Sequence, residues 1–196
     1  MTRRGVYINK VEPIRSLEKI REIKEYLLEN ESPRNYLLFV LGVNFALRIS
    51  DLLLLKVKDV RSEDGKILSL FYIRESKTNK EKTISINRAA KDALSFYFKN
   101  TNTQQTDWLF PSKTNDCHVN RSWCWKLIQQ WIREVRLEGR FGTHSLRKTF
   151  GYQARMQGIS IELIQAKFNH SSPAVTRRYI GITGDEITKM EQEVNI

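Results

Sequence analysis

The sequence predicts a mainly helical domain with one small antiparallel sheet, an α+β fold. Apolar residues recur at helical spacing over residues 16–47 and again from residue 88 onward. Between these regions, apolar residues follow one another over 67–73 and again over 83–86, and the polar link 75–82 is typical of a hairpin loop. A length of 196 residues fits one domain with a buried core.

The chain is expected to begin with an irregular lead-in over residues 1–15. Ser16 can cap a first helix, in which apolar side chains share one face: Ile20, Ile23 and Leu27. Ser32 and Pro33 then mark the start of a second helix, because a capping residue is followed by proline at the first helical position.

The second helix is expected to run to about Leu47 and to lie at the centre of the fold, since it is apolar nearly all round. Ser50 and Asp51 can begin a third helix. The strand that follows, residues 67–73, is expected to be covered on both faces because it is apolar without interruption at most positions.

Helical patterns return in the second half of the chain, at 88–99 and then in a long helix with one apolar stripe: Cys124, Leu127, Ile128, Trp131 and Val135. Thr143 can cap the next helix and Gly158 can end it. Ser160 can start another, and Ser172 with Pro173 repeats the combination of cap and proline. No internal domain boundary is visible.

The charge balance predicts a polyanionic partner. Lys and Arg number 33 against 22 Asp and Glu, a formal net charge of +11, and a basic surface gains free energy when it displaces counterions from phosphates. The alternative is a basic domain that is merely soluble. No membrane partner is expected, because the most apolar stretch, residues 36–47, is too short to span a bilayer.

The two cysteines are too few for a disulfide framework, which favours a reducing cytosol. A zinc site at Cys117, His118 and Cys124 is the alternative, but this spacing fits no standard zinc pattern. No glycine-rich phosphate loop supports a nucleotide cofactor.

Several residues could carry chemistry, although each has a structural alternative when it is taken singly. Arg48 ends an apolar helix, where it could meet an anion or pair with Asp51. His144 and Arg147 share one helix face near its start and could face a phosphate, or could be surface residues.

Three further candidates lie in the hairpin and near the C-terminal end. Lys77 sits in the predicted hairpin loop, from which it could reach into a groove or remain solvated. His170 could be a turn residue, and Tyr179, on the last predicted helix, could be part of the core.

Together these positions are far more specific than any one of them. Arg, hairpin Lys, His-x-x-Arg, His and Tyr occur in that order within Leu-Arg-Ile-Ser-Asp-Leu-Leu, His-Ser-Leu-Arg-Lys-Thr-Phe and Asn-His-Ser-Ser-Pro-Ala-Val-Thr-Arg-Arg-Tyr-Ile. This sequence resembles the catalytic domain of the tyrosine recombinases, the phage integrase family, from about Pro13 onward.

The resemblance implies a role for each matching residue. Tyr179 would be the nucleophile that forms a 3′-phosphotyrosyl link, and Arg48 and Arg147 would hold the non-bridging oxygens. His144 would accept a proton and bind phosphate, His170 would hydrogen-bond the phosphate, and Lys77 would protonate the leaving 5′-oxygen. Asp51 would support the site from behind. Phe168-Asn169-His170 departs from the usual Leu-Gly-His, which could shift the turn.

The resemblance implies a site-specific recombinase or integrase that cleaves and rejoins double-stranded DNA without metal, ATP or another cofactor. A homotetrameric synapse, optional DNA-bending accessory proteins and a cytoplasmic, nucleoid-associated location would follow. The alternatives are relaxation of one duplex in the manner of a type IB topoisomerase, and a non-catalytic DNA-binding relative. A nuclease or an RNA-binding module is more remote.

The expected organisation is a lead-in at 1–15, a catalytic domain at 16–184 and a tail at 185–196 that is a candidate for docking on a neighbouring protomer. Larger relatives carry an N-terminal domain that clamps the opposite face of DNA. The chain is therefore either a natural short form, which Met1 favours, or a fragment. Weak, salt-sensitive DNA binding is expected in either case.

Overall fold

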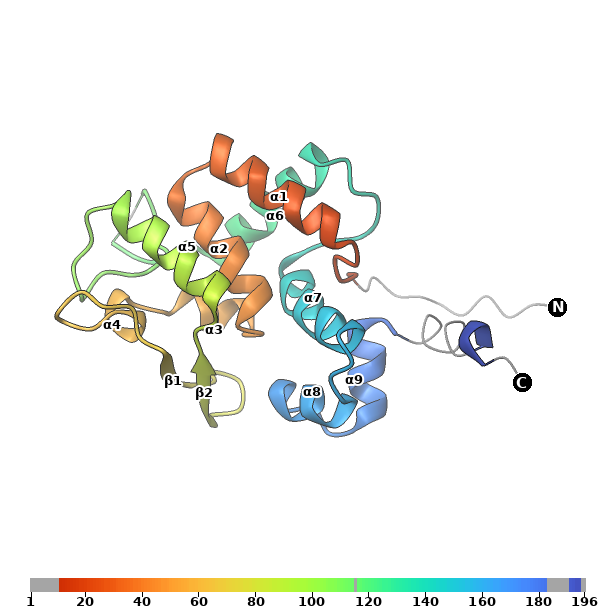
Figure 1. The fold of residues 1–196 in the computed structure, drawn as a ribbon. Helices are drawn as coiled ribbons and strands as arrows, with labels where there is room; N and C mark the ends of the chain where they lie inside the picture. Colours follow the sequence, from red (N-terminus) through yellow and green to blue (C-terminus); the bar gives the residue numbers. More distant parts are fainter. Residues whose placement is uncertain (1–10, 115, 183–190, 195–196) are drawn as a thin grey trace.

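The computed structural model describes residues 11–114, 116–182 and 191–194, so most of the lead-in and of the tail at 185–196 lies outside the described residues. Two strands and a series of helices follow one another along the chain (Figure 1). Their order is α1 (Leu17–Asn30), α2 (Pro33–Asn44), α3 (Ile49–Leu53), α4 (Val57–Val60), β1 (Leu70–Arg74), β2 (Glu81–Ser85), α5 (Arg88–Lys99), α6 (Arg121–Glu134), α7 (Thr143–Met156), α8 (Ile161–Phe168) and α9 (Pro173–Ile180).

The central position of α2 is confirmed. Every residue from Tyr36 to Leu41 is buried, and the helix packs against α1, α5 and α7. Pro33 occupies the first turn, as expected from a residue that lacks an N–H and has a preset φ. In α1, the Ser16 hydroxyl accepts the N–H of Lys19, which is the predicted N-cap.

The prediction that the second helix continues to Leu47 is wrong. α2 ends at Asn44, and Ala46 then takes a left-handed φ of 56°. The following residues extend, so that Arg48 becomes the N-cap of α3, which starts at Ile49 rather than at Ser50 or Asp51. Apolar burial on both sides of this turn hid it from a periodicity argument, since buried turns and buried helices look alike in composition.

The hairpin forms as predicted, but the prediction that its first strand is covered on both faces is wrong. β1 and β2 pair antiparallel, with Phe71 opposite Ile84 and Tyr72 opposite Thr83. Phe71 and Ile84 are buried, whereas Tyr72 is 72% exposed. A two-stranded sheet has only one face on the core here, so alternate residues face solvent.

The short helix α4 was not predicted. It is held by a bridge between Lys56 and Trp108 and by burial of Val57 and Val60. These contacts join segments that are far apart in sequence, and four residues carry too little helical periodicity to indicate a helix.

The last helices begin and end close to the predicted positions. Gly142 rather than Thr143 is the N-cap of α7, whose first residue is Thr143. The Ser160 and Ser172 side chains cap α8 and α9, and Gly181 ends α9 with a left-handed φ of 79°. Gly158 also has positive φ just after α7.

A second core lies beneath α7, α8 and α9, separate from the main core around α2. Its buried members include Tyr152, Phe168 and Ile180, together with Ala46 from the turn after α2. The hairpin lies beside α8, since the Lys82 ammonium donates to the carbonyl of Lys167 (Figure 1). The turn at Ala46, the hairpin and the α7–α9 unit therefore meet in one place.

The lead-in is docked where it is described. Residues 11–16 form no helix or strand, but the Ile14 side chain is buried and its N–H donates to the Thr149 hydroxyl at 2.8 Å. The Glu12 N–H donates to the carbonyl of Arg140 at 2.7 Å.

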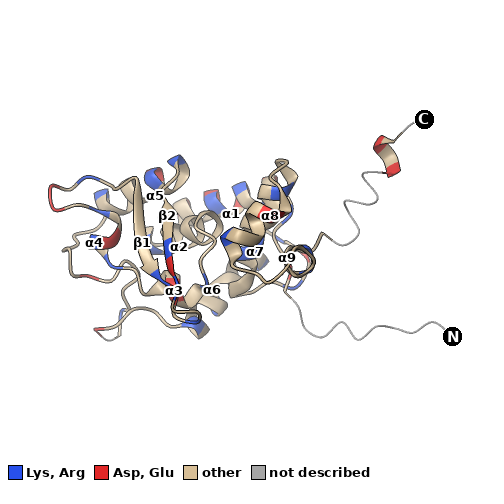
Figure 2. Cartoon of the chain, turned by 90° about the horizontal axis from the view of Figure 1, so that it is seen from below, with Lys and Arg blue, Asp and Glu red and all other residues tan. Residues whose placement is uncertain are grey.

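Seen from below, basic residues are visible on α5, α7, α8 and α9, and acidic ones on α4 and near α3 (Figure 2).

Candidate active site

Arg48 is placed by the turn between α2 and α3. Its Nη1 lies 2.9 Å from Glu75 Oε2 and 3.9 Å from Asp51 Oδ2. The Arg48 side chain is 20% exposed, while the two carboxylate side chains are 1% and 2% exposed. The carboxylates therefore hold the guanidinium from the interior side, and its exposed part can meet an anion that approaches from solvent.

Arg147 is held by backbone carbonyls rather than by a carboxylate. Its Nη1 donates to Ala46 O at 2.7 Å and its Nη2 to Phe168 O at 2.9 Å, and its guanidinium lies 4.7 Å from the centroid of the Phe168 ring. The residue is only 3% exposed. Burial lowers the pKa of Arg147, and Tyr179 opposes that effect. A buried charge whose hydrogen-bond acceptors are neutral favours an additional anion nearby.

Tyr179 and His170 lie beside Arg147 at the junction of α8 and α9. The two rings are 4.9 Å apart between centroids and meet edge to face, and Tyr179 also contacts the ring of Phe168 at 5.5 Å. The Nζ of Lys148 lies 5.1 Å from the centroid of the Tyr179 ring. Burial raises the pKa of Tyr179, and the charges of Arg147 and Arg48 counteract that rise. The two arginines thus favour the phenolate form.

The departure at Phe168-Asn169-His170 does not displace His170 from the other site residues. Asn169 caps α8 in the left-handed region with φ of 54°, a conformation that glycine adopts freely and that asparagine tolerates better than most residues. His170 Nδ1 then lies 3.1 Å from the Thr176 hydroxyl. Burial and the charges of Arg147, Arg48 and Lys82 lower the pKa of His170 to about 4, so the imidazole is neutral at pH 7 without a bound anion.

His144 and Tyr179 line one cavity of about 550 Å³. Its other charged lining residues are basic: Arg121, Lys148 and Arg178. Partial burial and the charges of Arg121 and other basic residues lower the pKa of His144. A neutral imidazole at the edge of a positively charged cavity can accept a proton.

Asp51 lies behind the site, on α3. It is 5% exposed, and its Oδ1 accepts the N–H of Ser76 at 3.0 Å. The carboxylate thus connects the helix that follows Arg48 with the loop between β1 and β2.

The structure does not bring Lys77 together with the other predicted site residues. Lys77 is exposed in the loop between β1 and β2, and within the described ranges it has no hydrogen bond or ion pair. Its neighbours are fixed, since the Thr78 hydroxyl donates to Glu75 Oε2 at 2.8 Å and the Glu75 N–H donates to Lys80 O at 2.9 Å.

Two residues at the site were missed by the sequence argument, Glu75 and Lys82. Glu75 is buried, and Lys82, with a 14% exposed side chain, lies 3.5 Å from it. A signal was present, because Phe71 and Ile73 face the core and alternation places residue 75 on the same face of the strand. The same alternation places Lys82 on the inner face of β2 with Ile84.

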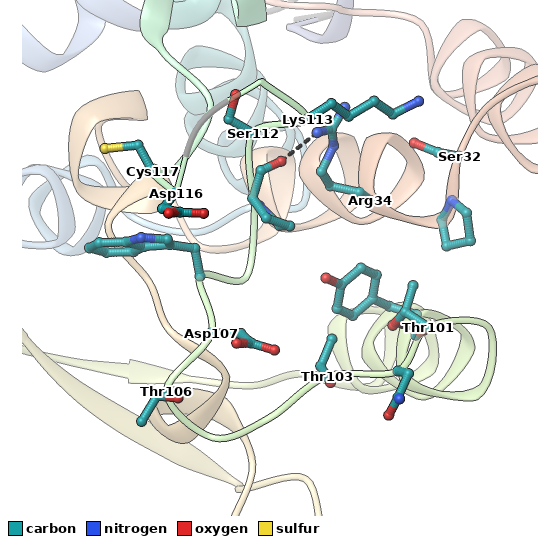
Figure 3. A pocket seen from close by; sticks show the side chains of 15 residues that line it. Ser32, Arg34, Thr101, Thr103, Thr106, Asp107, Ser112, Lys113, Asp116 and Cys117 are labelled. Atoms are coloured by element: carbon teal, nitrogen blue, oxygen red, sulfur yellow. Dashed lines mark hydrogen bonds between the residues drawn. The ribbon is translucent and has the colours of Figure 1, made fainter.

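A larger cavity of about 630 Å³ lies elsewhere and contains none of the predicted site residues. Figure 3 shows it between the start of α2 and the segment 101–117, with the Arg34 guanidinium bonded to the carbonyl of Pro111. Arg34 is also stacked over Trp123, 4.4 Å from the ring centroid. Arg34 is thus fixed by contacts within the fold.

In the part of the chain that the structure describes, no three His, Cys, Asp or Glu side chains gather as a metal site would require. Cys117 is exposed, whereas Cys124 is fully buried, and burial raises the pKa of its thiol to about 12. Within the same described residues, no helix has both the length and the apolar character needed to cross a membrane.

Comparison with known proteins shows the family to which the chain belongs. The Phage integrase family matches residues 15–184. The "Probable integrase/recombinase YoeC" of Bacillus subtilis is 42% identical over 175 residues, which cover 89% of this chain and 92% of that protein. The "Tyrosine recombinase XerA" of Pyrococcus furiosus is 23% identical over 91% of this chain, which spans 60% of XerA.

Solved structures share the fold. A crystal structure of XerA recombinase matches with a TM-score of 0.74 at 21% identity, covering 95% of this chain and 68% of that one. The XerH site-specific recombinase, bound to a palindromic difH substrate after cleavage, matches with a TM-score of 0.71 at 20% identity, over 94% of this chain and 54% of that one. These names support a recombinase or integrase over the topoisomerase-like alternative, and the chain belongs to the phage integrase family of tyrosine recombinases.

Proposed function

We propose that this chain carries out site-specific recombination by cleaving and rejoining duplex DNA through a covalent bond between Tyr179 and a DNA phosphate. The observation that carries the proposal is the position of Tyr179 beside Arg147, a buried guanidinium that donates to the carbonyls of Ala46 and Phe168. A phosphodiester would supply the anion that this arrangement favours. The relatives named integrase and recombinase support the same reaction.

In the proposed reaction, the Tyr179 oxygen attacks the phosphorus and the 5′-oxygen of the next nucleotide leaves. Arg48 and Arg147 bind the non-bridging oxygens and stabilise the extra negative charge of the pentacovalent transition state. His144 accepts the phenol proton, and His170 binds the phosphate once the anion has raised its pKa. The 3′-phosphotyrosyl bond retains the energy of the broken bond, so a second 5′-hydroxyl can reverse the step without ATP. We propose that the arginines provide the electrostatic stabilisation that a metal would provide elsewhere.

The proposed general acid for the leaving oxygen is Lys77, which must then move toward the phosphate when DNA binds. Lys82 lies closer to Arg48 and Arg147, but its ammonium already contacts Glu75 and the carbonyl of Lys167. We therefore assign Lys82 to holding the hairpin against α8 and keep Lys77 as the acid.

Double-stranded DNA is the proposed partner. XerH is described as bound to a difH substrate and the Tn1549 transposon integrase as in complex with circular intermediate DNA, and the charge of +11 suits a polyanion. Recombination between two duplexes further implies a tetramer of this chain on DNA, with optional DNA-bending proteins, in the nucleoid. The tail at 185–196 remains the candidate contact between protomers.

The test is covalent capture on nicked duplexes. After cleavage, the short fragment that bears the 5′-hydroxyl diffuses away, so the strand cannot be rejoined and the protein stays attached to the DNA. A pool of nicked duplexes with randomised sequence avoids the need to know the site, and sequencing of the trapped DNA then identifies it. Wild-type protein should give an adduct that survives denaturant, and Tyr179→Phe should abolish it. Tyr152→Phe is the matched control, because it removes a hydroxyl from a buried tyrosine of the same core. An undiminished adduct in Tyr179→Phe would refute the proposal.

A second capture assay assigns the general acid. Substrates with sulfur in place of the leaving 5′-oxygen need no proton, because a thiol has a pKa of only about 8.5. Lys77→Met should lose cleavage of the ordinary substrate and regain it on the sulfur substrate. Lys82→Met should show no such rescue. The opposite pattern would assign the acid to Lys82.

A further inference from the structure

The buried carboxylate of Glu75 lies between two parts of the proposed machinery. On one side, its Oε2 is 2.9 Å from Arg48 Nη1. On the other side, the same oxygen accepts the hydroxyl of Thr78 at 2.8 Å, in the loop that carries Lys77. Its Oε1 is 3.5 Å from Lys82 Nζ.

This carboxylate is ionised at neutral pH. Burial alone would raise the pKa of Glu75, but contacts with Arg48 and Thr78 and the charge of Lys82 outweigh burial and lower it. A buried negative charge is stable only with such partners. The contacts of Glu75 therefore restrict where the side chains of Arg48, Thr78 and Lys82 can lie.

The loop is fixed at both residues that flank Lys77. The Ser76 N–H donates to Asp51 and the Thr78 hydroxyl donates to Glu75. Both of these carboxylates also face Arg48. The position of the loop and the position of the Arg48 guanidinium are therefore set by the same two side chains.

We infer that Glu75 is a positioning residue for strand cleavage, which couples the phosphate-binding Arg48 to the loop that delivers Lys77. Through its contacts with Arg48 and Thr78, Glu75 holds the phosphate-binding guanidinium and the loop in one arrangement, from which the Lys77 side chain can reach the leaving oxygen. Glu75 itself does not touch the DNA. This inference rests on the proposed function, and it assigns to the carboxylate a part in placing the proton donor.

The first test compares Glu75→Gln with wild type on the ordinary nicked substrate and on the 5′-sulfur substrate. Glutamine keeps the shape but removes the charge that orients Arg48 and Lys82. The rate of adduct formation should fall about 10- to 100-fold on the oxygen substrate. On the sulfur substrate this loss of rate should be smaller by a factor of at least about five, since part of the defect lies in proton delivery. DNA affinity should change by no more than about threefold, because Glu75 does not contact DNA.

Glu81→Gln is the matched control. It removes the same charge from the same hairpin, but Glu81 is an exposed residue of β2 that pairs with Arg74 at the surface. Its adduct rate should stay within about twofold of wild type on both substrates.

Thr78→Val tests the loop connection without touching the buried charge. Valine matches threonine in shape and lacks only the hydroxyl that donates to Glu75. This variant should slow the oxygen substrate and leave the sulfur substrate near the wild-type rate, and it carries the test alone if Glu75→Gln does not fold.

Equal losses on both substrates in Glu75→Gln, or a Glu75→Gln rate equal to that of Glu81→Gln, would overturn the inference. So would a Thr78→Val variant with no substrate-dependent defect. Failure of the proposed function has a different signature, because wild-type protein would then form no Tyr179-dependent adduct on either substrate.

Discussion

Gly151 of α7 offers a direct test of how closely Tyr179 is positioned. A methyl group at this residue would lie 2.6 Å from Ile180 Cγ2 and 2.7 Å from two ring carbons of Phe168. Ordinary contact begins near 3.4 Å, so Gly151→Ala requires a displacement of about 0.8 Å of α9 or of the Phe168 ring. Ile180 is the neighbour of Tyr179, and Phe168 supplies a carbonyl to Arg147.

Two effects on stability oppose each other in this variant. Alanine favours a helix over glycine by about 1 kcal/mol, whereas overpacking a core costs about 1–3 kcal/mol. The net loss is about 0–2 kcal/mol, which corresponds to a fall in Tm of about 2–4 °C for each kcal/mol in a chain of this size. The adduct rate should fall much further, by about 100-fold, because a shift of this size misaligns the nucleophile.

Thermal unfolding and the capture assay measure the two effects separately. Gly42→Ala is the control, since its methyl group would meet Leu146 Cδ1 at 2.6 Å and Leu146 Cβ at 3.2 Å, contacts of similar tightness that involve neither α9 nor Phe168. It should lose less activity than Gly151→Ala. A Gly151→Ala protein with raised Tm and an unchanged adduct rate would refute the claim that α9 is fixed against α7.

Three further predictions concern charge. Arg147→Lys should reduce the adduct rate by about 100-fold or more, because the compact ammonium lacks the planar fork with which the guanidinium reaches two separate carbonyls and a phosphate; a rate near wild type on the capture substrate would contradict this. Burial and the nearby charges of Arg147, Arg48 and Lys82 lower the pKa of His170 to about 4, below its value in the unfolded chain. The contribution of neutral His170 to the free energy of unfolding is therefore fully present above about pH 6.5 and is lost as the pH falls toward 4. The Tm of His170→Gln should depend less on pH between 7 and 5 than the Tm of wild type. Parallel curves of Tm against pH for the two proteins would contradict the lowered pKa of His170. The Kd for DNA should rise about 100-fold or more between 50 and 200 mM salt, and a change below about threefold in an anisotropy titration would count against phosphate contacts by the basic surface.

Local signals in the sequence predicted those parts of the fold that local physics determines. The caps at Ser16, Ser160 and Ser172 act within one helical turn, and the buried run from Tyr36 to Leu41 makes α2 central whatever surrounds it. These features need no knowledge of the tertiary structure.

The turn at Ala46 could not be predicted in the same way. A left-handed alanine costs free energy locally and persists only because tertiary contacts compensate for it, including the bond from Arg147 to its carbonyl. The exposed outer face of β1 has the same origin, since the exposure of Tyr72 is visible only once the elements are packed.

The sequence indicated which residues are candidates for the site, but not which contacts hold them in place. The order of polar residues along the chain predicts six residues around one phosphate, and the structure places four of them, Arg48, Arg147, His170 and Tyr179, within mutual electrostatic range. Lys77 lies apart from them. The carboxylate of Glu75 was overlooked because a charge in a strand pattern is usually solvated, although alternation with Phe71 and Ile73 places it on the inner face, where it meets Arg48 and Lys82.

The turn at Ala46 also determines how the two arginines are spaced. The carbonyl of Ala46 fixes Arg147, and Arg48 lies only two residues further along the same backbone. The gap between the two guanidiniums therefore depends on this short backbone segment and one hydrogen bond, in addition to the packing of α2 against α7. An insertion or deletion of one residue between Ala46 and Arg48 would alter the gap directly. Selection should consequently tolerate drift in the core more readily than any change in the length of this segment.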